Sequence, residues 1–308
     1  MSGISFEGQR AIVTGAGVAI GRAHAHDLAR RGAAVLVNDA DVASADRVVE
    51  EIRAAGGKAV ANHDPVGSKE AGEAIVAHAV REFGGIEIVI NNAGVRGHSL
   101  FENMTEQQIK AVMDVHLMAS IYVTQPAWKI MRAQKYGRIV MTSSSSGMFS
   151  HQGLANYAAA KAGVYGLTKA LAYEGGPYDI KVNALLPYSP DVGNRKPPIP
   201  NMAEEWAKFQ TPEETAKLKT TVSTPDMISH MAVYLASREC EVSGELFSVC
   251  NGRYARVFVG IADGWLSRPD EAVSAEAVRD HLSEIRDISR HSVPMWLFEE
   301  VAAVARRI

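Results

Sequence analysis

The fold is decided by residues 11–21, whose sequence is A-I-V-T-G-A-G-V-A-I-G. The first four predict a short buried strand, and the pattern that follows predicts a helix over roughly Gly21–Arg31. Glycines between the two let the backbone turn tightly and approach a pyrophosphate, which the free N–H groups of a helix N-terminus attract. A tight turn without a ligand is the alternative interpretation. The stretch therefore predicts a βα unit with a candidate dinucleotide site.

Short apolar runs alternate with helical patterns along most of the chain. The expected strands are Ala11–Thr14, Ala34–Asn38, Lys58–Asn62, Ile86–Asn91, Gly137–Thr142, Lys181–Leu186 and Glu245–Cys250. Repeated βα units place such strands in parallel, with helices on both faces of the sheet. The sequence therefore predicts an α/β, doubly wound (Rossmann) fold with a seven-stranded, mainly parallel sheet.

Capping signals place the expected helices. Ser68 is expected to cap a helix that reaches Phe83, and Thr105 with Gln108 forms a capping box. Further helices are expected over Ala43–Ala55 and Asn156–Glu174, from Thr211-Pro212, from Thr224-Pro225 to about Ser237, after Ser274 and near Trp296–Arg306.

The chain divides into two parts in this interpretation. Residues 1–250 form the expected dinucleotide-binding domain, and residues 251–308 form a C-terminal extension. The periodic pattern is lost from about residue 187 to 222, and the segment that begins at Pro187 and ends at Thr211 contains five prolines. We expect this segment to be the substrate loop.

The composition is that of a soluble globular protein, with 47% apolar and 22% charged residues. A net charge of −3 argues against a nucleic-acid-binding protein and against general attraction to anionic membranes. No apolar run approaches the roughly 18 residues of a membrane span, and no signal-peptide pattern begins the chain. We therefore expect a cytoplasmic protein that acts on a small molecule.

An acidic residue at the end of the second expected strand bears on the cofactor. Asp39 follows A-V-L-V-N, where a carboxylate would hydrogen-bond the adenosine ribose hydroxyls and repel a 2′-phosphate. No Arg or Lys lies inside the glycine-rich turn or directly after Asp39. The expected cofactor is NAD, and a solvated turn residue is the alternative interpretation of Asp39.

Three side chains of the stretch Met141–Lys169 form the candidate catalytic set. Tyr157 and Lys161 are four residues apart on an expected helix, so they share one face. Ser144 lies thirteen residues before Tyr157, where a strand meets a small-residue loop. Hydroxyl, phenol and ammonium can therefore converge on one point. Ordinary helix surface beside a Ser-rich loop is the alternative.

Other polar residues are weaker candidates. His24 and His26 are two residues apart and face different directions on their helix, so no metal site is expected. His98 and His151 lie in loops that we expect near the mouth of the pocket.

The ordered motifs resemble those of the short-chain dehydrogenase/reductase family. They are T-G-A-G-V-A-I-G, Asn91-Asn92-Ala93-Gly94, Ser144 and Tyr157-x-x-x-Lys161. Y-G-R-I-V-M-T-S-S-S-S-G, Q-G-L-A-N-Y-A-A-A-K, R-E-C-E-V-S-G-E-L-F and the tail are similar to the (R)-3-hydroxyacyl-CoA dehydrogenase unit of type 2 multifunctional enzymes. That family also oxidises 17β-hydroxysteroids. The resemblance covers most of the chain.

The resemblance implies a set of cofactor contacts. Glycines of the turn would hold the pyrophosphate, Asp64 would meet the adenine amino group, and Pro187 would lie against the nicotinamide. The implied cofactor-binding residues are Gly15, Gly17, Val18, Ile20, Gly21, Asp39, Asp64, Pro65, Asn92, Ala93, Gly94, Tyr157, Lys161 and Pro187.

Four positions depart from the pattern of the wider family. Ala19 replaces the middle glycine of T-G-x-x-x-G-x-G, and Pro65 has no N–H to offer the adenine ring. Tyr188 stands where the family has a glycine after the sixth strand. His116 replaces the helix asparagine that holds a proton-relay water, and the resemblance to the multifunctional enzymes implies a variant relay member. A satisfied helix histidine is the alternative.

The implied chemistry is oxidation of a secondary alcohol. A tyrosine with a pKa of about 10 is a poor base at neutral pH, so the Lys161 ammonium and the nicotinamide charge would favour the phenolate. Ser144 would hydrogen-bond the substrate oxygen. The catalytic residues are then Ser144, Tyr157, Lys161 and His116.

The expected function is that of an NAD-dependent oxidoreductase acting on a 3-hydroxyacyl-CoA or a hydroxysteroid. General carbonyl reductases and sugar-alcohol dehydrogenases are the alternative among enzymes, and a catalytically idle NAD-binding protein is the alternative outside them. The resemblance also implies a homodimer or a dimer of dimers, with the tail against a partner subunit.

Overall fold

The computed structural model describes residues 3–188, 204, 208–209, 211–220, 224–268 and 272–307. The chain divides into two compact units, Met1–Arg256 and Val257–Ile308. Each unit is described by itself below.

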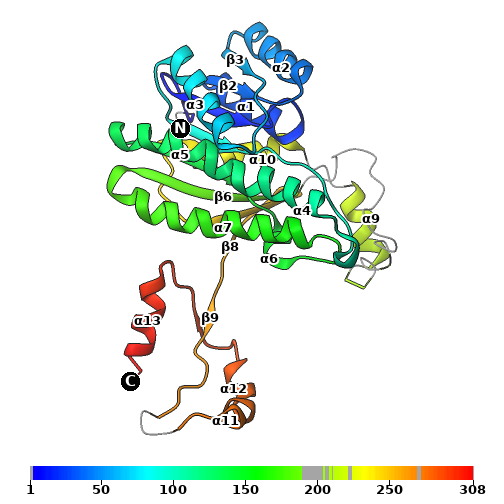
Figure 1. The fold of residues 1–308 in the computed structure, drawn as a ribbon, viewed down its shortest axis with the longest axis vertical. Coiled ribbons are helices and arrows are strands. Elements are labelled where there is room, and N and C mark those ends of the chain that lie inside the picture. The colour runs from blue at the N-terminus through cyan, green and yellow to red at the C-terminus, as the bar shows by residue number, and fades with distance from the viewer. Residues whose placement is uncertain are drawn as a thin grey trace. The chain divides into compact units, whose positions relative to one another are not determined.

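The first unit is built on a sheet of eight strands in the order β3-β2-β1-β4-β5-β6-β7-β8 (Figure 1). The strands are β1 (Arg10–Thr14), β2 (Ala34–Asn38), β3 (Lys58–Asn62), β4 (Ile88–Asn91), β5 (Gly137–Thr142), β6 (Ile180–Tyr188), β7 (Leu246–Cys250) and β8 (Arg253–Val257). Neighbouring strands from β3 to β7 are all parallel. The predicted parallel α/β fold is confirmed.

Helices cover both faces of this sheet. The helices of the first unit are α1 (Ala19–Arg30), α2 (Val42–Ala54), α3 (Lys69–Phe83), α4 (Glu106–Met113), α5 (Ala119–Gln134), α6 (Ser145–Phe149), α7 (Ala155–Gly175), α9 (Pro212–Thr220) and α10 (Pro225–Ala236), with short helical turns η1 (Phe101–Asn103), η2 (Asp114–Met118) and η3 (Gly176–Tyr178). On one face α1 packs on α2 and α10; on the other α3 packs on α5, and α4 on α7 (Figure 1).

The core lies around the central strands. The residues of β2 and β4 are buried along their whole lengths, as are those of β1 after Arg10. Such strands read as continuous apolar runs because helices cover both faces of a parallel sheet. The last residue of each of these strands is polar and buried: Thr14 in β1, Asn38 in β2 and Asn91 in β4. The sheet order reverses between β1 and β4, and ligands of doubly wound folds bind at the strand carboxyl ends beside such a point.

The eighth strand corrects the predicted seven. Two residues link β7 to β8: Asn251 with φ 49° and Gly252 with φ 78°. Left-handed backbone at both positions is typical of a tight hairpin turn, which joins antiparallel strands. Asn-Gly is the strongest short hairpin signal in a sequence. The sequence-based division places this pair in the C-terminal extension, whereas in the structure it links two strands of the main sheet.

Strand β6 is longer than predicted. It continues through Pro187 and Tyr188, which pair with Val249 and Cys250 of β7. Its pairing with β5 ends at Leu185, so the missing N–H of Pro187 removes no bond on that side. Most of the expected substrate loop, residues 187–222, lies outside the described residues.

The predicted helix caps are confirmed. Ser68 Oγ accepts a hydrogen bond from the N–H of Ala71 at the start of α3. At α4, Thr105 Oγ1 accepts from Gln108 N at 3.2 Å, and Gln108 Oε1 accepts from Thr105 N at 2.9 Å. The side-chain oxygens satisfy N–H groups that the first turn of a helix leaves free.

The second unit contains short elements. They are β9 (Ile261–Ala262), α11 (Ala275–Asp280), α12 (Leu282–Ile285), β10 (His291–Ser292) and α13 (Leu297–Ala305). The predicted helices after Ser274 and near Trp296 are confirmed as α11 and α13. None of the unit's described residues is buried. In the described parts of the whole chain, no helix has the length and apolarity needed to cross a membrane.

Candidate active site

The glycine-rich turn joins β1 to α1. Gly15 has a left-handed backbone with φ 61°, and a Cβ added there would lie 2.7 Å from Cα of Ala93. A Cβ on Gly21 would overlap the carbonyl oxygen of Gly15. Ala19, which stands at a family glycine position, also has a left-handed backbone with φ 47°. That conformation costs an alanine about 1–2 kcal/mol.

The N-terminus of α1 carries free backbone donors. Its N-cap residue, Val18, is extended and makes no side-chain cap hydrogen bond, and the first turn, where Ile20 lies half-buried, has no acidic residue. By contrast, Asp41 caps α2 and Ser68 caps α3. Uncapped N–H groups at the positive end of a helix suit a phosphate. These residues therefore fit the diphosphate of a dinucleotide.

Asp39 lies directly after β2, beside the turn. Its Oδ2 accepts a hydrogen bond from Gly17 N at 2.9 Å, and its Oδ1 accepts from Asp41 N at 3.0 Å. A Cβ added to Gly17 would lie 2.9 Å from Oδ2, so only glycine allows this approach. Both carboxylate oxygens are thus held in place at the edge of the predicted dinucleotide site.

Thr14, the last residue of β1, is not among the predicted site residues, yet it ties the turn to the N-A-G loop. Its Oγ1 accepts hydrogen bonds from Asn92 N at 3.0 Å and Ala93 N at 3.1 Å. The Asn92 side-chain amide donates to Thr14 O at 3.1 Å and Gly15 O at 3.0 Å. Asn92 and Ala93 therefore hold the shape of the turn. A hydroxyl at the last position of the strand was the available signal.

Asp64 belongs to a polar cluster at the ends of β2 and β3. Its Oδ2 accepts from Asn62 Nδ2 at 2.8 Å, and its carbonyl oxygen accepts from Asn38 Nδ2 at 2.9 Å. Asn62 also lies 3.2 Å from Nδ1 of His78. Asp64 is half-buried and Pro65 exposed, so the backbone here is fixed by the two buried asparagines.

The predicted catalytic side chains converge between β5 and α7. Ser144 caps α6, and its Oγ accepts from Ser146 N at 3.1 Å. The Ser144 hydroxyl also lies near the phenol of Tyr157 and lowers the pKa of that phenol. Lys161 Nζ lies 5.7 Å from the centre of the Tyr157 ring and donates to the Thr142 carbonyl. The side chains that the i, i+4 spacing predicted to meet do so.

Burial sets the charge states of the pair. It lowers the pKa of Lys161 to about 7. Burial also raises the pKa of Tyr157, and the Ser144 hydrogen bond opposes that rise. We expected the lysine to pull the phenol toward lower pKa. In this structure desolvation raises the pKa of the phenol, a cost of burial that the residue spacing does not record.

His116 lies in the π-helical turn η2, behind the phenol. Its ring meets that of Tyr157 edge-on, with centroids 5.0 Å apart. Nε2 lies 2.8 Å from the Val95 carbonyl oxygen and 3.1 Å from Val95 N. Burial, followed by the charge of Lys161, lowers the pKa of His116 to about 3. The ring is therefore neutral, and its buried Nδ1 has no hydrogen-bond partner among the described residues.

A second histidine flanks the phenol. The His98 ring lies edge-on to Tyr157 with centroids 5.7 Å apart. Its loop is fixed on both sides, because Asn156 Nδ2 donates to Gly97 O at 2.9 Å and Ser99 N donates to Gly153 O at 3.2 Å. Burial lowers the pKa of His98, as do the nearby charges of Arg96 and His151.

The remaining sequence-predicted residues are placed as follows. Gly94 packs on His116, since an added Cβ would lie 2.7 Å from Cε1 of that ring. Pro187 and Tyr188 end strand β6 and are both half-buried. No group of three or more metal-ligating side chains that could hold an ion occurs in the described part of the chain.

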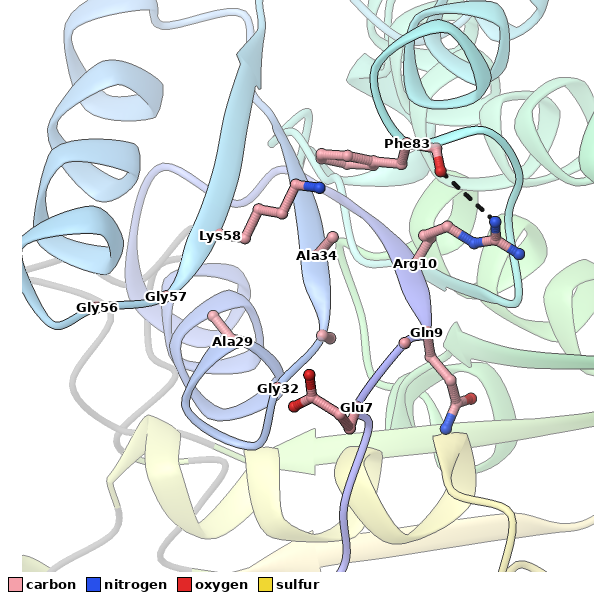
Figure 2. Close-up of a pocket in the computed structure, with 12 residues that line it drawn as sticks. Glu7, Gln9, Arg10, Ala29, Gly32, Ala34, Gly56, Gly57, Lys58 and Phe83 are labelled. Carbon is pink, nitrogen blue, oxygen red and sulfur yellow. Dashed lines mark hydrogen bonds between the residues drawn. The ribbon is translucent and has the colours of Figure 1, made fainter.

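A cavity of about 410 Å³ lies elsewhere in the first unit (Figure 2). Its lining includes Arg10, Ala34 and Lys58, the first residues of β1, β2 and β3. Arg10 Nη1 donates to the carbonyl of Phe83, whose ring lies 5.4 Å from Lys58 Nζ (Figure 2). The cavity thus opens at the amino ends of the strands, opposite the edge that carries the glycine-rich turn, and does not belong to the candidate active site.

Comparison with known proteins agrees with this geometry. The family model described as "short chain dehydrogenase" matches residues 9–198. Peroxisomal multifunctional enzyme type 2 of Mus musculus is 36% identical over 317 residues, covering 98% of this chain and 40% of that protein. The chain therefore spans less than half the length of that relative.

Two further proteins match along nearly their whole lengths. A short-chain type dehydrogenase/reductase of Mycobacterium tuberculosis is 37% identical, over 90% of this chain and 94% of its own. A solved structure of 7α-hydroxysteroid dehydrogenase, in complex with NADH and 7-oxo glycochenodeoxycholic acid, is 27% identical with a TM-score of 0.70. It covers 80% of this chain and 95% of its own.

Proposed function

Because the chain belongs to the short-chain dehydrogenase family, and is thus an oxidoreductase acting on CH–OH groups, we propose that it is an NAD-dependent secondary-alcohol dehydrogenase. The proposed substrate is a 3-hydroxyacyl-CoA or a hydroxysteroid. The observation that carries this proposal is the convergence of Ser144, Tyr157 and Lys161 between β5 and α7.

The choice of NAD is supported by Asp39. Its carboxylate is fixed by two backbone N–H groups beside the turn, where a negative charge disfavours a 2′-phosphate. The 7α-hydroxysteroid dehydrogenase that matches this chain was solved with NADH. The substrate class is supported by that enzyme and by the multifunctional enzymes among the relatives.

The residues of this chain divide the chemistry between them. Bound NAD would accept the hydride from the carbinol carbon. Ser144 would hold the substrate oxygen through a hydrogen bond, and the Tyr157 phenolate would accept the hydroxyl proton. Lys161 would favour the phenolate in its protonated form and can hold a ribose hydroxyl. Nδ1 of His116 is buried with no hydrogen-bond partner among the described residues, and it would be the nitrogen that holds a relay water.

The alternative of a catalytically idle protein gains nothing from the geometry. Its support was the sequence departures at Ala19, Pro65 and Tyr188. Ser144, Tyr157 and Lys161 nevertheless lie together between β5 and α7. A carbonyl reductase or sugar-alcohol dehydrogenase remains the alternative substrate assignment.

We also propose a homodimer or a dimer of dimers in the cytoplasm. The described residues of the second unit include exposed apolar side chains on α13, among them Leu297, Phe298 and Val301. Apolar faces of this kind favour association. Light scattering on the purified full chain tests this, and a monomer at micromolar concentration would contradict it.

The test of the reaction is turnover followed by NADH absorbance, over a panel of hydroxyacyl-CoAs, hydroxysteroids and simple alcohols. Tyr157→Phe should lower kcat by at least about a thousandfold with NADH affinity retained, since the base is lost. Tyr173→Phe, an exposed tyrosine on the same helix, is the matched control. Near-normal turnover by Tyr157→Phe would refute the mechanism, and higher kcat/KM with NADP would refute the cofactor.

A further inference from the structure

The peptide group of Gly17 is held between an anion and a cation. Its N–H donates to Oδ2 of Asp39 at 2.9 Å. Its carbonyl oxygen accepts from Nη2 of Arg47 at 3.4 Å. Arg47 comes from the second turn of α2, and no motif pointed to it. The turn expected to receive the cofactor is therefore bracketed by charges of both signs.

Arg47 is aimed at the turn by its own helix. Nη2 also donates to Oγ of Ser44 at 3.2 Å, three residues earlier on the same face of α2. A Cβ added to Gly17 would lie 2.7 Å from Cβ of Ser44, so α2 and the turn are in direct contact. The acceptors of the guanidinium in these bonds are neutral. Its charge is thus not matched by a carboxylate in the described contacts.

Asp39 cannot easily move away from this position. Each of its carboxylate oxygens already accepts one backbone hydrogen bond, from Gly17 and from Asp41. A fixed carboxylate leaves lone pairs for ribose hydroxyls and repels a phosphate. A guanidinium prefers the opposite ligand, because its planar N–H groups match phosphate oxygens.

We propose that Arg47 is a specificity-determining residue of the adenosine end of the cofactor site. It can bind a 2′-phosphate, and Asp39 is the element that prevents this in the native chain. The inference rests on the proposed NAD-dependent function. In this proposal, the chain discriminates against NADP because the Asp39 carboxylate, held by two backbone N–H groups, repels the 2′-phosphate that Arg47 could otherwise bind.

The experiment is a binding titration that needs no turnover. NADH or NADPH is titrated into the full chain, and binding is followed by the fluorescence of the dinucleotide. Four proteins are compared: the native chain, Asp39→Asn, Arg47→Gln and the double variant. Asp39→Asn should lower the Kd for NADPH at least about tenfold. Adding Arg47→Gln should reverse most of this change, because loss of a charge-assisted hydrogen bond weakens binding about tenfold. NADH affinity should change about twofold or less on Arg47→Gln.

Two controls separate a ligand from a structural strap. Arg53→Gln removes the same charge from the same helix, where the side chain donates to Ala59 O, and should leave NADPH binding by Asp39→Asn unchanged. Comparing the affinity for adenosine 2′,5′-bisphosphate with that for 5′-AMP isolates the contribution of the 2′-phosphate. In the Asp39→Asn chain, Arg47→Lys should retain part of the gain in NADPH affinity.

The outcomes divide cleanly. If Arg47→Gln weakens NADH and NADPH equally, or leaves the NADPH gain of Asp39→Asn intact, Arg47 only braces the turn and the inference is wrong. If the native chain binds neither dinucleotide, the proposed function fails first. Native turnover with NAD together with no effect at Arg47 overturns this inference alone.

Discussion

Replacing Ala19 by glycine should stabilise the protein. Ala19 is the first residue of α1 and has φ 47°, in the left-handed region where a Cβ crowds the following carbonyl. The side chain is exposed, so its methyl group contributes little burial. The substitution therefore removes backbone strain at small cost in packing.

Two effects of opposite sign decide the magnitude. Relief of the left-handed conformation is worth about 1–2 kcal/mol. Glycine makes the unfolded chain more flexible, which lowers the free energy of unfolding by about 0.4–1 kcal/mol. The difference is a net stabilisation of about 0.5–1 kcal/mol, or a rise in Tm of about 1–2 °C for a chain of this size.

The assay is urea denaturation followed by circular dichroism, with Tm from calorimetry. Ala74→Gly is the matched control, because Ala74 is an exposed residue inside α3. There glycine should lower the free energy of unfolding by about 1 kcal/mol. The two substitutions are chemically identical and should have opposite signs.

A loss of stability in Ala19→Gly equal to that in Ala74→Gly would refute the reasoning. It would mean that the left-handed backbone at residue 19 is not a strained state. A change in the denaturant slope would indicate an altered unfolded state, so the slope is compared as well.

Three further predictions follow from burial and charge. Arg138, 2% exposed, donates to Ser237 O and Asp179 O, so Arg138→Met should lower the free energy of unfolding by about 3 kcal/mol in urea denaturation; a change under 1 kcal/mol would contradict this. His98→Ala should lower kcat about two- to tenfold, because the ring contact with Tyr157 is lost, and should leave KM for NAD unchanged. His98→Phe keeps an aromatic ring and should have a kcat near the native value. Equal losses of kcat in the two variants would show that His98 acts through its polar atoms. The pKa of Lys161 in the folded state, about 7, lies below its ordinary value of 10.5, so the unfolded chain binds this proton more tightly than the folded chain. The free energy of unfolding should therefore rise between pH 7 and 10 in the native chain relative to Lys161→Met. If the two proteins show the same dependence of stability on pH, the pKa of Lys161 is not shifted.

The parallel sheet could be predicted because its signals are local. Buried apolar runs, capping residues and glycine turns each specify a few neighbouring residues, and the strand ends at Thr14, Asn38 and Asn91 follow from them. The edge hairpin was equally local in Asn251-Gly252, yet it lay beyond the last expected βα unit. There the pattern of the preceding units gave no reason to look for an antiparallel strand.

The candidate site was predictable in its residues more than in its energetics. Helical spacing brings Tyr157 and Lys161 together whatever surrounds them. Their charge states depend on how much water the whole fold excludes, which no motif records. Arg47 was missed for a related reason, because its contact with Gly17 crosses from one βα unit to the next.

The contact between Gly94 and His116 makes the side chains allowed at these two positions depend on each other. The backbone at Gly94 is one that alanine can adopt, yet an added Cβ would lie 2.7 Å from the imidazole. A larger side chain at position 94 therefore requires the imidazole to shift or a smaller side chain to replace it. With His116 in its present position, only glycine fits at this point of the loop.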